Sequence, residues 1–110
     1  MTSLGMTVLK GGSGKGYRFR VYPLGTRFRK KCGVFVITSR SHSEEGGRRH
    51  KPLYVGQTED LSQPFDQHRK AEQFMQHGAN CICLHPETSE ESRMAKELDL
   101  IASLHPVCND

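Results

Sequence analysis

The sequence predicts a single α+β domain, in which a small, mainly antiparallel three-stranded sheet is flanked by helices and preceded by an extra basic strand. Three observations predict this class. Short β-branched or alternating runs are separated by Gly and Pro, two later segments carry helix start and stop signals, and 110 residues suffice for one modest core. We expect residues 1–16 to be a flexible segment and residues 17–110 to form the domain.

The N-terminal segment is rich in Gly and Ser, which is typical of a mobile lead-in. Its "GGSGKG" stretch departs from the phosphate-binding loop pattern, because Leu9 occupies the first glycine position and Gly16 follows Lys15. The next run, "YRFRVYPL", alternates aromatic and basic residues and predicts a strand with one basic face. Pro23 and Gly25 end it.

The predicted sheet is built from three further runs. Residues 32–39, "CGVFVITS", are short and continuously apolar, which favours a central strand. Residues 51–57, "KPLYVGQ", form a second strand, joined to the first by the polar loop 40–50 as a long hairpin. Residues 81–84, "CICL", supply the third.

Two helices complete the predicted domain. Ser62 is a suitable N-cap and Pro64 fits the first turn of a helix that runs to about His77, with Gly78 as its stop. A second helix follows a capping box formed by Thr88 and Glu91 and ends before Pro106. Its expected buried stripe consists of Met94, Leu98, Ile101 and His105 or Leu104.

Charge is distributed unevenly along the chain. Residues 1–51 hold 12 Lys and Arg against 2 acids, a net charge of +10, whereas residues 52–110 hold 4 against 10, a net charge of −6. A basic half of this kind suits a polyanion, although basic runs are equally often solvated surface. The expected nucleic-acid contacts are Arg18, Arg20, Arg27, Arg29, Lys30, Lys31 and Arg69.

The cysteines favour a reducing compartment. The first 16 residues lack the pattern of a signal peptide and no apolar run approaches the length of a membrane span, so we expect a cytoplasmic protein without a membrane partner. Cys81, Cys83 and His85 alternate along one strand and could bind a soft metal, but the second ligand pair of a structural zinc site is missing. Buried strand cysteines are the favoured interpretation.

Three residues are candidates for chemistry. Glu97 lies beside the apolar stripe of the last helix, where a carboxylate needs a cation, a donor or a metal. Tyr54 ends a strand, and His68 lies on the first helix, one turn after Pro64. Taken singly, each has a structural alternative: an edge glutamate, a strand aromatic and a surface histidine.

In combination, these residues resemble the GIY-YIG nuclease domain. The first strand carries "GVF" where the family has Gly-Ile-Tyr, and the second carries "YVG" for Tyr-Ile-Gly. A "QTEDL" run, a helical His, a helical Glu before "LDLI" and a terminal "PVCN" follow in the family's order. The match spans about residues 32–109, and the positions in register are Gly33, Tyr54, Gly56, Thr58, Asp60, Leu61, His68, Glu97, Leu100, Ile101, Pro106 and Asn109.

The resemblance implies roles for the matched residues. Glu97 would bind one divalent ion, Mg²⁺ or Mn²⁺, Tyr54 would activate or position water, and His68 would assist near the phosphate. Asn109 would be a structural or site-edge residue. Such a site supplies what phosphodiester hydrolysis requires: a deprotonated nucleophile, a placed metal and stabilisation of charge on the phosphate.

Two departures weaken this site. Phe35 replaces the tyrosine of the first triplet and lacks a hydroxyl, and Pro64 replaces the helix arginine, a loss on the order of 10² to 10³ in rate. Arg69, Lys51 or the basic loop residues Arg48 and Arg49 are the available substitutes.

Two functions follow from this reading. One is a metal-dependent GIY-YIG-like DNA endonuclease of reduced activity. The other is a catalytically inactive domain that binds nucleic acid through its basic N-terminal region. DNA is the expected partner, and RNA remains open.

Overall fold

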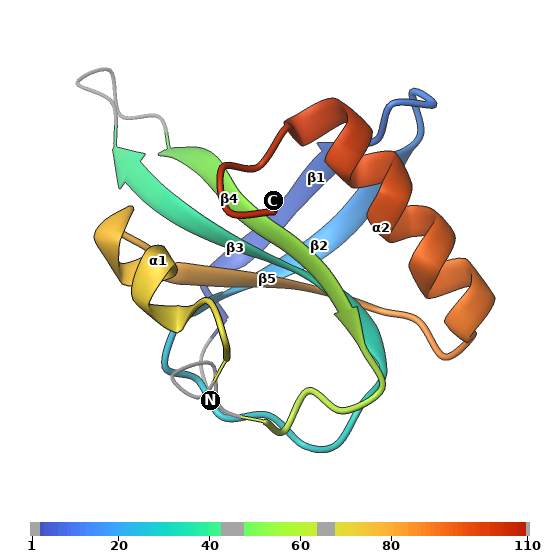
Figure 1. Ribbon diagram of the computed structural model, residues 1–110, viewed down its shortest axis with the longest axis horizontal. Helices are drawn as coiled ribbons and strands as arrows, with labels where there is room; N and C mark the ends of the chain where they lie inside the picture. The colour runs from blue at the N-terminus through green and yellow to red at the C-terminus, as the bar shows by residue number, and fades with distance from the viewer. Residues whose placement is uncertain (1–2, 43–47, 64–67, 110) are drawn as a thin grey trace.

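The computed structural model describes residues 3–42, 48–63 and 68–109, and it is an α+β domain, as predicted. The expected sheet of three strands with one extra strand is wrong, because the sheet has five antiparallel strands (Figure 1). The elements in chain order are β1 (Gly5–Lys10), β2 (Gly16–Pro23), β3 (Gly33–His42), β4 (Arg48–Thr58), α1 (Ala71–Gln76), β5 (Cys81–Pro86) and α2 (Glu90–Leu104).

The strand order is β1-β2-β5-β3-β4, so the last strand of the chain is inserted at the centre. β5 pairs with β2 through Val21 and Cys83 and with β3 through Val36 and the same Cys83. β3 is paired on both sides, as its continuous apolar run predicted. β4 and β1 are the two outer strands of the sheet.

Strand β1 is the element that sequence analysis missed, because it lies within the segment expected to be a lead-in. It forms a hairpin with β2, and the Gly- and Ser-rich stretch is the tip of this hairpin. Gly11 is needed there, since a Cβ at this position would lie 2.0 Å from the Asp99 carboxylate of α2. The glycines therefore let the hairpin approach a helix that is distant in sequence.

The central strands of the sheet are buried on both faces. One face carries Phe35, Ile37, Ile82 and Leu84 and is covered by Phe74 of α1, together with other members of the same cluster. The opposite face carries Phe19, Val21, Val34, Val36, Val55, Cys81 and Cys83 and is covered by Leu100 of α2. Figure 1 shows the two helices on either side of β4. We refer to these surfaces as the α1 face and the α2 face.

Helix α1 is shorter than predicted, since it spans only Ala71–Gln76. Ser62 is not its N-cap; the Ser62 N–H and hydroxyl both donate to the Asp60 carboxylate, which closes a turn instead. Pro64, the expected first-turn residue, lies outside the described residues. Gly78, with φ of 77°, follows the helix as predicted.

Helix α2 begins and faces differently from the prediction. Ser89, not Thr88, is its N-cap and accepts from the Ser92 N–H. Met94 and Leu98, assigned to the buried stripe, are 48% and 65% exposed. Ile101 and Leu104 of the predicted stripe do pack, partly buried, on the α2 face. The helix also buries Leu100 and Arg93, whose guanidinium is satisfied by polar groups at the sheet edge. No helix within the described ranges is long and apolar enough to cross a bilayer.

Candidate active site

The candidate site begins where Tyr54 and Gly56 point to the α1 face from β4. Gly56 is the register partner of Phe35, and a Cβ on Gly56 would lie 2.6 Å from Phe35 Cζ and 2.8 Å from Tyr54 Cε2. Both distances are shorter than any normal carbon contact. The "YVG" triplet therefore has a physical basis: the glycine leaves room for two aromatic rings to close over the strand.

His68 joins this aromatic group from the segment before α1. Its ring lies 5.2 Å from that of Tyr54, centroid to centroid, at an interplanar angle of 69°. Phe74 of α1 contacts both rings, at 5.3 Å from Tyr54 and 5.2 Å from His68. Two of the three residues predicted to share a site are therefore together. We call Tyr54, His68, Phe35 and Phe74 the Tyr54–His68 cluster.

The hydrogen bonding of His68 defines its chemistry. The Lys70 backbone N–H donates to His68 Nδ1 over 3.1 Å, which leaves the proton of the neutral ring on Nε2. Burial lowers the pKa of His68, and the positive charges of Arg69 and Lys70 lower it further. At neutral pH His68 thus presents an uncharged Nε2–H donor.

The polar atoms of the two rings are open. Among the residues that the structure describes, neither the Tyr54 hydroxyl nor His68 Nε2 has a hydrogen-bond partner, and neither is a buried unsatisfied atom. Both side chains are half-buried. A hydroxyl and an imidazole N–H thus belong to two rings in contact, and neither is bonded to a group in the described part of the chain.

Lys70 is a cation that sequence analysis overlooked in favour of Arg69. Lys70 is 7% exposed, and its ammonium lies 5.6 Å from the centre of the Tyr54 ring and donates to the Cys108 carbonyl oxygen. Arg69 is exposed. The only signal in the sequence was the position of Lys70, two residues after His68 and directly before α1.

Glu97 lies on α2, the helix that covers the α2 face, whereas Tyr54 and His68 lie on the α1 face, so the structure does not bring Glu97 together with the two rings. The Gln57 backbone N–H, three residues beyond Tyr54, lies near enough to Glu97 to act on its pKa, and Arg93 Nε donates to the Gln57 side chain over 3.0 Å. Burial raises the pKa of Glu97, and the Gln57 N–H opposes this rise. The carboxylate is therefore partly desolvated beside the strand that carries Tyr54.

Asn109 closes the outer edge of β4, in keeping with its expected structural role. Its Oδ1 accepts from the Val55 N–H over 2.7 Å and its Nδ2 donates to the Val55 carbonyl over 2.8 Å. The Cys108 N–H donates to the Leu53 carbonyl just before it. The C-terminal tail thus satisfies edge groups of β4 between the rings and Glu97.

The residues around Glu97 fit a divalent ion only as a water-rich site. No group of three or more His, Cys, Asp or Glu side chains able to hold a metal occurs in the described part of the chain. Glu97 alone offers a half-buried carboxylate whose charge a cation would stabilise. Mg²⁺ keeps several waters and binds through one or two carboxylates plus phosphate oxygens, so this single ligand is compatible with it.

The cysteine metal site is not formed. Cys81 and Cys83 are buried, and burial raises the pKa of Cys83 to about 12, which disfavours the thiolate that a metal requires. His85 uses both ring nitrogens elsewhere, with Nδ1 2.8 Å from the Arg18 carbonyl and Nε2 2.9 Å from Lys96 Nζ. None of the four cysteines, all within the described residues, forms a disulfide.

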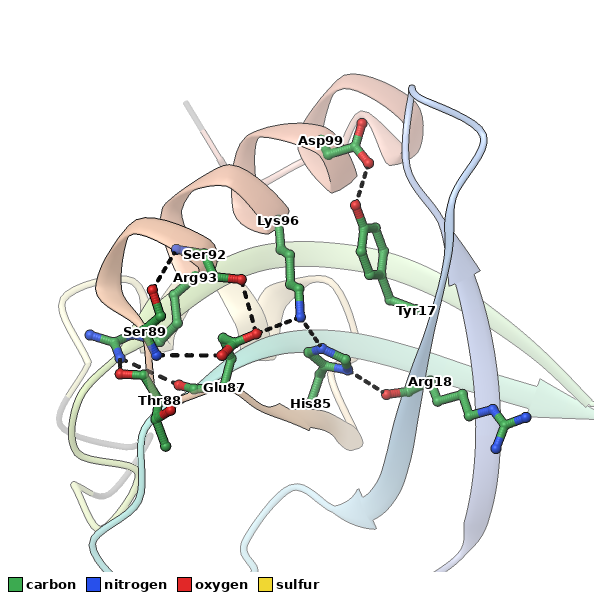
Figure 2. A network of polar contacts seen from close by, with 10 residues as sticks. All are labelled: Tyr17, Arg18, His85, Glu87, Thr88, Ser89, Ser92, Arg93, Lys96 and Asp99. Carbon is green, nitrogen blue, oxygen red and sulfur yellow. Dashed lines mark hydrogen bonds and ion pairs between the residues drawn. The ribbon is translucent and has the colours of Figure 1, made fainter.

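His85 belongs instead to a polar network between β2, β5 and α2 (Figure 2). Lys96 Nζ also donates to Glu87 over 2.7 Å, and this bond is the main cause that lowers the pKa of Glu87 to about 2. Beside it, the Tyr17 hydroxyl donates to Asp99 over 2.6 Å. We call Tyr17, His85, Glu87, Lys96 and Asp99 the α2 network.

The seven predicted nucleic-acid contacts are all exposed. Arg18 and Arg20 lie on β2, four follow in the loop to β3, and Arg69 precedes α1.

Comparisons of the chain with protein-family models, curated proteins and solved structures found no match, so the functional argument depends on the chain's own residues.

Proposed function

We propose that this domain is a GIY-YIG-like endonuclease that hydrolyses phosphodiester bonds of DNA with the help of one divalent ion. The observation that carries the proposal is the contact between the Tyr54 and His68 rings, whose hydroxyl and Nε2 bond to no group among the described residues. Tyr17 and His85, which are also half-buried, bond instead to protein groups.

The open atoms fit distinct tasks. The Tyr54 hydroxyl can both donate and accept, which suits a group that holds the attacking water. The neutral His68 presents Nε2–H, which suits hydrogen bonding to an oxygen of the phosphate as negative charge develops there. Lys70 adds positive charge next to the Tyr54 ring, a kind of charge that the family pattern supplies from the sequence position of Pro64.

Glu97 would hold the ion. When bound, Mg²⁺ or Mn²⁺ stabilises charge on the phosphate and lowers the pKa of a coordinated water. The carboxylate is already partly desolvated, so an ion there would favour its ionised form. The Gln57 N–H would orient Glu97 at the edge of the strand that carries Tyr54.

The test is nicking of supercoiled plasmid with Mg²⁺ or Mn²⁺. We expect the wild-type chain to nick slowly and Glu97→Gln to be inactive. The matched control, Glu91→Gln, removes the same charge from an exposed position of the same helix and should nick like wild type. Pro64→Arg should raise the rate if the missing guanidinium limits it. Nicking that persists in Glu97→Gln would refute the proposal.

A second candidate is a domain of this type that binds nucleic acid without cutting it. Phe35 favours it, because its ring is 5% exposed in the cluster and brings no hydroxyl where the resemblance implies one. Salt-sensitive retention of DNA, with no nicking by either the wild type or Pro64→Arg, would establish this function in place of the first.

A further inference from the structure

The β1–β2 hairpin presents one uncovered face. On β2, Phe19 and Val21 are buried towards α2, whereas Arg18 and Arg20, which alternate with them, are exposed on the other side. Their register partners on β1 are Val8 and Met6, which are 58% and 55% exposed. Two arginines and two apolar side chains therefore lie next to each other on an open sheet surface. We call Met6, Val8, Arg18 and Arg20 the hairpin face.

The hairpin face lies on the same side of the sheet as the candidate site. Arg20 is the register partner of Leu84, Leu84 of Phe35, and Phe35 of Gly56. Residues paired in register point to the same face, so the hairpin face and the Tyr54–His68 cluster lie on one side of the sheet, with the buried Leu84 and Phe35 between them. Three strand spacings separate Arg20 from Gly56, about 14 Å along the sheet.

Hydrogen bonds to α2 hold the β1–β2 hairpin on the side opposite the hairpin face. Asp99 of α2 accepts from the Ser13 N–H over 2.8 Å, from the Ser13 hydroxyl over 2.7 Å and from Tyr17. Figure 2 shows the Arg18 carbonyl bound by His85 while the Arg18 guanidinium points away from α2 and its network. Arg18 and Arg20 therefore extend from a strand that contacts with α2 and its network already hold in position.

The charge of this region identifies the class of partner. Residues 3–31 contain eight Lys and Arg and no acid. Arg18 and Arg20 are two residues apart on a strand, about 6.8 Å, a spacing that lets neighbouring cations follow successive phosphates of one strand. The nearest ring on this side of β2, Tyr22, packs against Phe28 and the α1-face core, so it is not presented as the stacking platform typical of single-strand binders.

We infer that the hairpin face binds the backbone of duplex DNA on one side of the bond that is cut. This inference names the substrate form, and it rests on the proposed function for the position of the cut. Arg18 and Arg20 contact phosphates, and Met6 and Val8 pack against the sugars between them.

The test measures binding without cleavage. Fluorescence anisotropy of labelled duplexes in EDTA compares wild type, Arg18→Gln/Arg20→Gln and the control Arg49→Gln/Lys51→Gln, which removes two exposed charges from β4. The first variant should weaken binding to unrelated duplexes equally and reduce the slope of log K against log salt by about 1.8. The control should reduce it less. Equal effects of both variants, or none, would overturn the inference.

Two further binding measurements test whether duplex DNA is the partner. Tighter binding of single-stranded DNA than of duplex DNA would contradict the inference. Binding to phosphatidylserine vesicles without binding to DNA would also contradict it. Thermal melts show whether the variants fold. If the Arg18→Gln/Arg20→Gln variant loses affinity for DNA but the wild type never nicks plasmid, the DNA-binding role of the hairpin face is supported and the proposed endonuclease activity is refuted. If the wild type nicks plasmid and this variant has an unchanged KM, only the role of the hairpin face is refuted.

Discussion

The α2 network and the Tyr54–His68 cluster each contain a tyrosine and a histidine, but the hydrogen bonding of these residues differs between the two regions. In the α2 network the Tyr17 hydroxyl bonds to Asp99, and His85 is engaged at both ring nitrogens. In the Tyr54–His68 cluster the rings are packed as closely, but the hydroxyl and Nε2 have no partner among the described residues.

The difference separates structural from functional polar groups. Satisfied donors and acceptors stabilise the placement of α2 and the hairpin and leave little to offer a ligand. Open polar atoms on packed rings gain nothing for the fold, but they are oriented for a ligand before it arrives. Substitutions in the two regions should therefore separate loss of stability from loss of activity.

The largest effect should come from Glu97→Gln. We expect a loss of nicking rate on the order of 10³. The melting temperature should not fall, because burial raises the pKa of Glu97 and so makes its charge costly to the folded state above the unfolded pKa. Mg²⁺ or Mn²⁺ should raise the melting temperature of wild type but not of this variant. A lower melting temperature without metal would mean that Glu97 is mainly structural.

Next is Tyr54→Phe, which removes the open hydroxyl and keeps the ring. We expect nicking to fall on the order of 10² with an unchanged melting temperature, since no described protein group loses a hydrogen bond. Tyr22→Phe, at another half-buried strand tyrosine on the α1 face, is the control and should retain activity. Full activity in Tyr54→Phe would remove the phenol from the mechanism.

Gly56→Ala should break the packing of the Tyr54–His68 cluster. The new Cβ would lie 2.6 Å from Phe35 Cζ, so one of the two rings must move, at a cost of about 2 kcal/mol in unfolding free energy. Gly25→Ala is the matched control, because nothing lies within 4 Å of its Cβ. Urea titrations of both variants give the comparison, and equal stability would show that the rings adjust freely.

The smallest effect should come from the α2 network. Tyr17→Phe should cost about 1 kcal/mol in unfolding free energy and leave the chemistry at Tyr54 intact. The Tyr17 hydrogen bond is the main cause that lowers the pKa of Asp99, with the Ser13 bonds next. Asp99 therefore stabilises the fold above its unfolded pKa near 3.8, and this contribution is lost as pH falls through the lower folded value.

The dependence of the unfolding free energy on pH in the acidic range tests this contribution of Asp99. The difference in unfolding free energy between wild type and Asp99→Asn should be constant near neutral pH and shrink below about pH 4. Ser103→Asn, at an exposed position of the same helix, should show no such dependence. A difference that grows on acidification would contradict the assignment of the Asp99 charge.

Much of the fold was readable in the sequence because it depends on local periodicity. The runs that became β2, β3, β4 and β5 have alternating or continuous apolar patterns, and Gly78 marked the end of α1. Tyr54 and His68 were identified as partners by their order and spacing. The requirement for Gly56 could also be anticipated from the "YVG" triplet, although its cause, the approach of Phe35, could not.

The features missed depend on partners far away in the chain. The glycine-rich tip that hid β1 is shaped by Asp99, 86 residues from Ser13. Met94 and Leu98 look like core by periodicity, but the helix turns Arg93 and Leu100 inward because Gln57 and the carbonyls before α2 satisfy the guanidinium. Lys70 is buried because the C-terminal tail returns to cover it.

By itself the sequence determined strands β2, β3, β4 and β5 and the presence of two helices, because strand pleat and helix pitch leave local patterns; Tyr54 and His68 were paired through the family resemblance, and His68 lies before α1. Only the tertiary structure decided that β5 enters between β2 and β3, which brings Arg20 into one row with Phe35 and Gly56. It also decided which polar groups are satisfied and which stay open. Hydrogen bonds and burial depend on neighbours in space, and a linear pattern does not specify those neighbours.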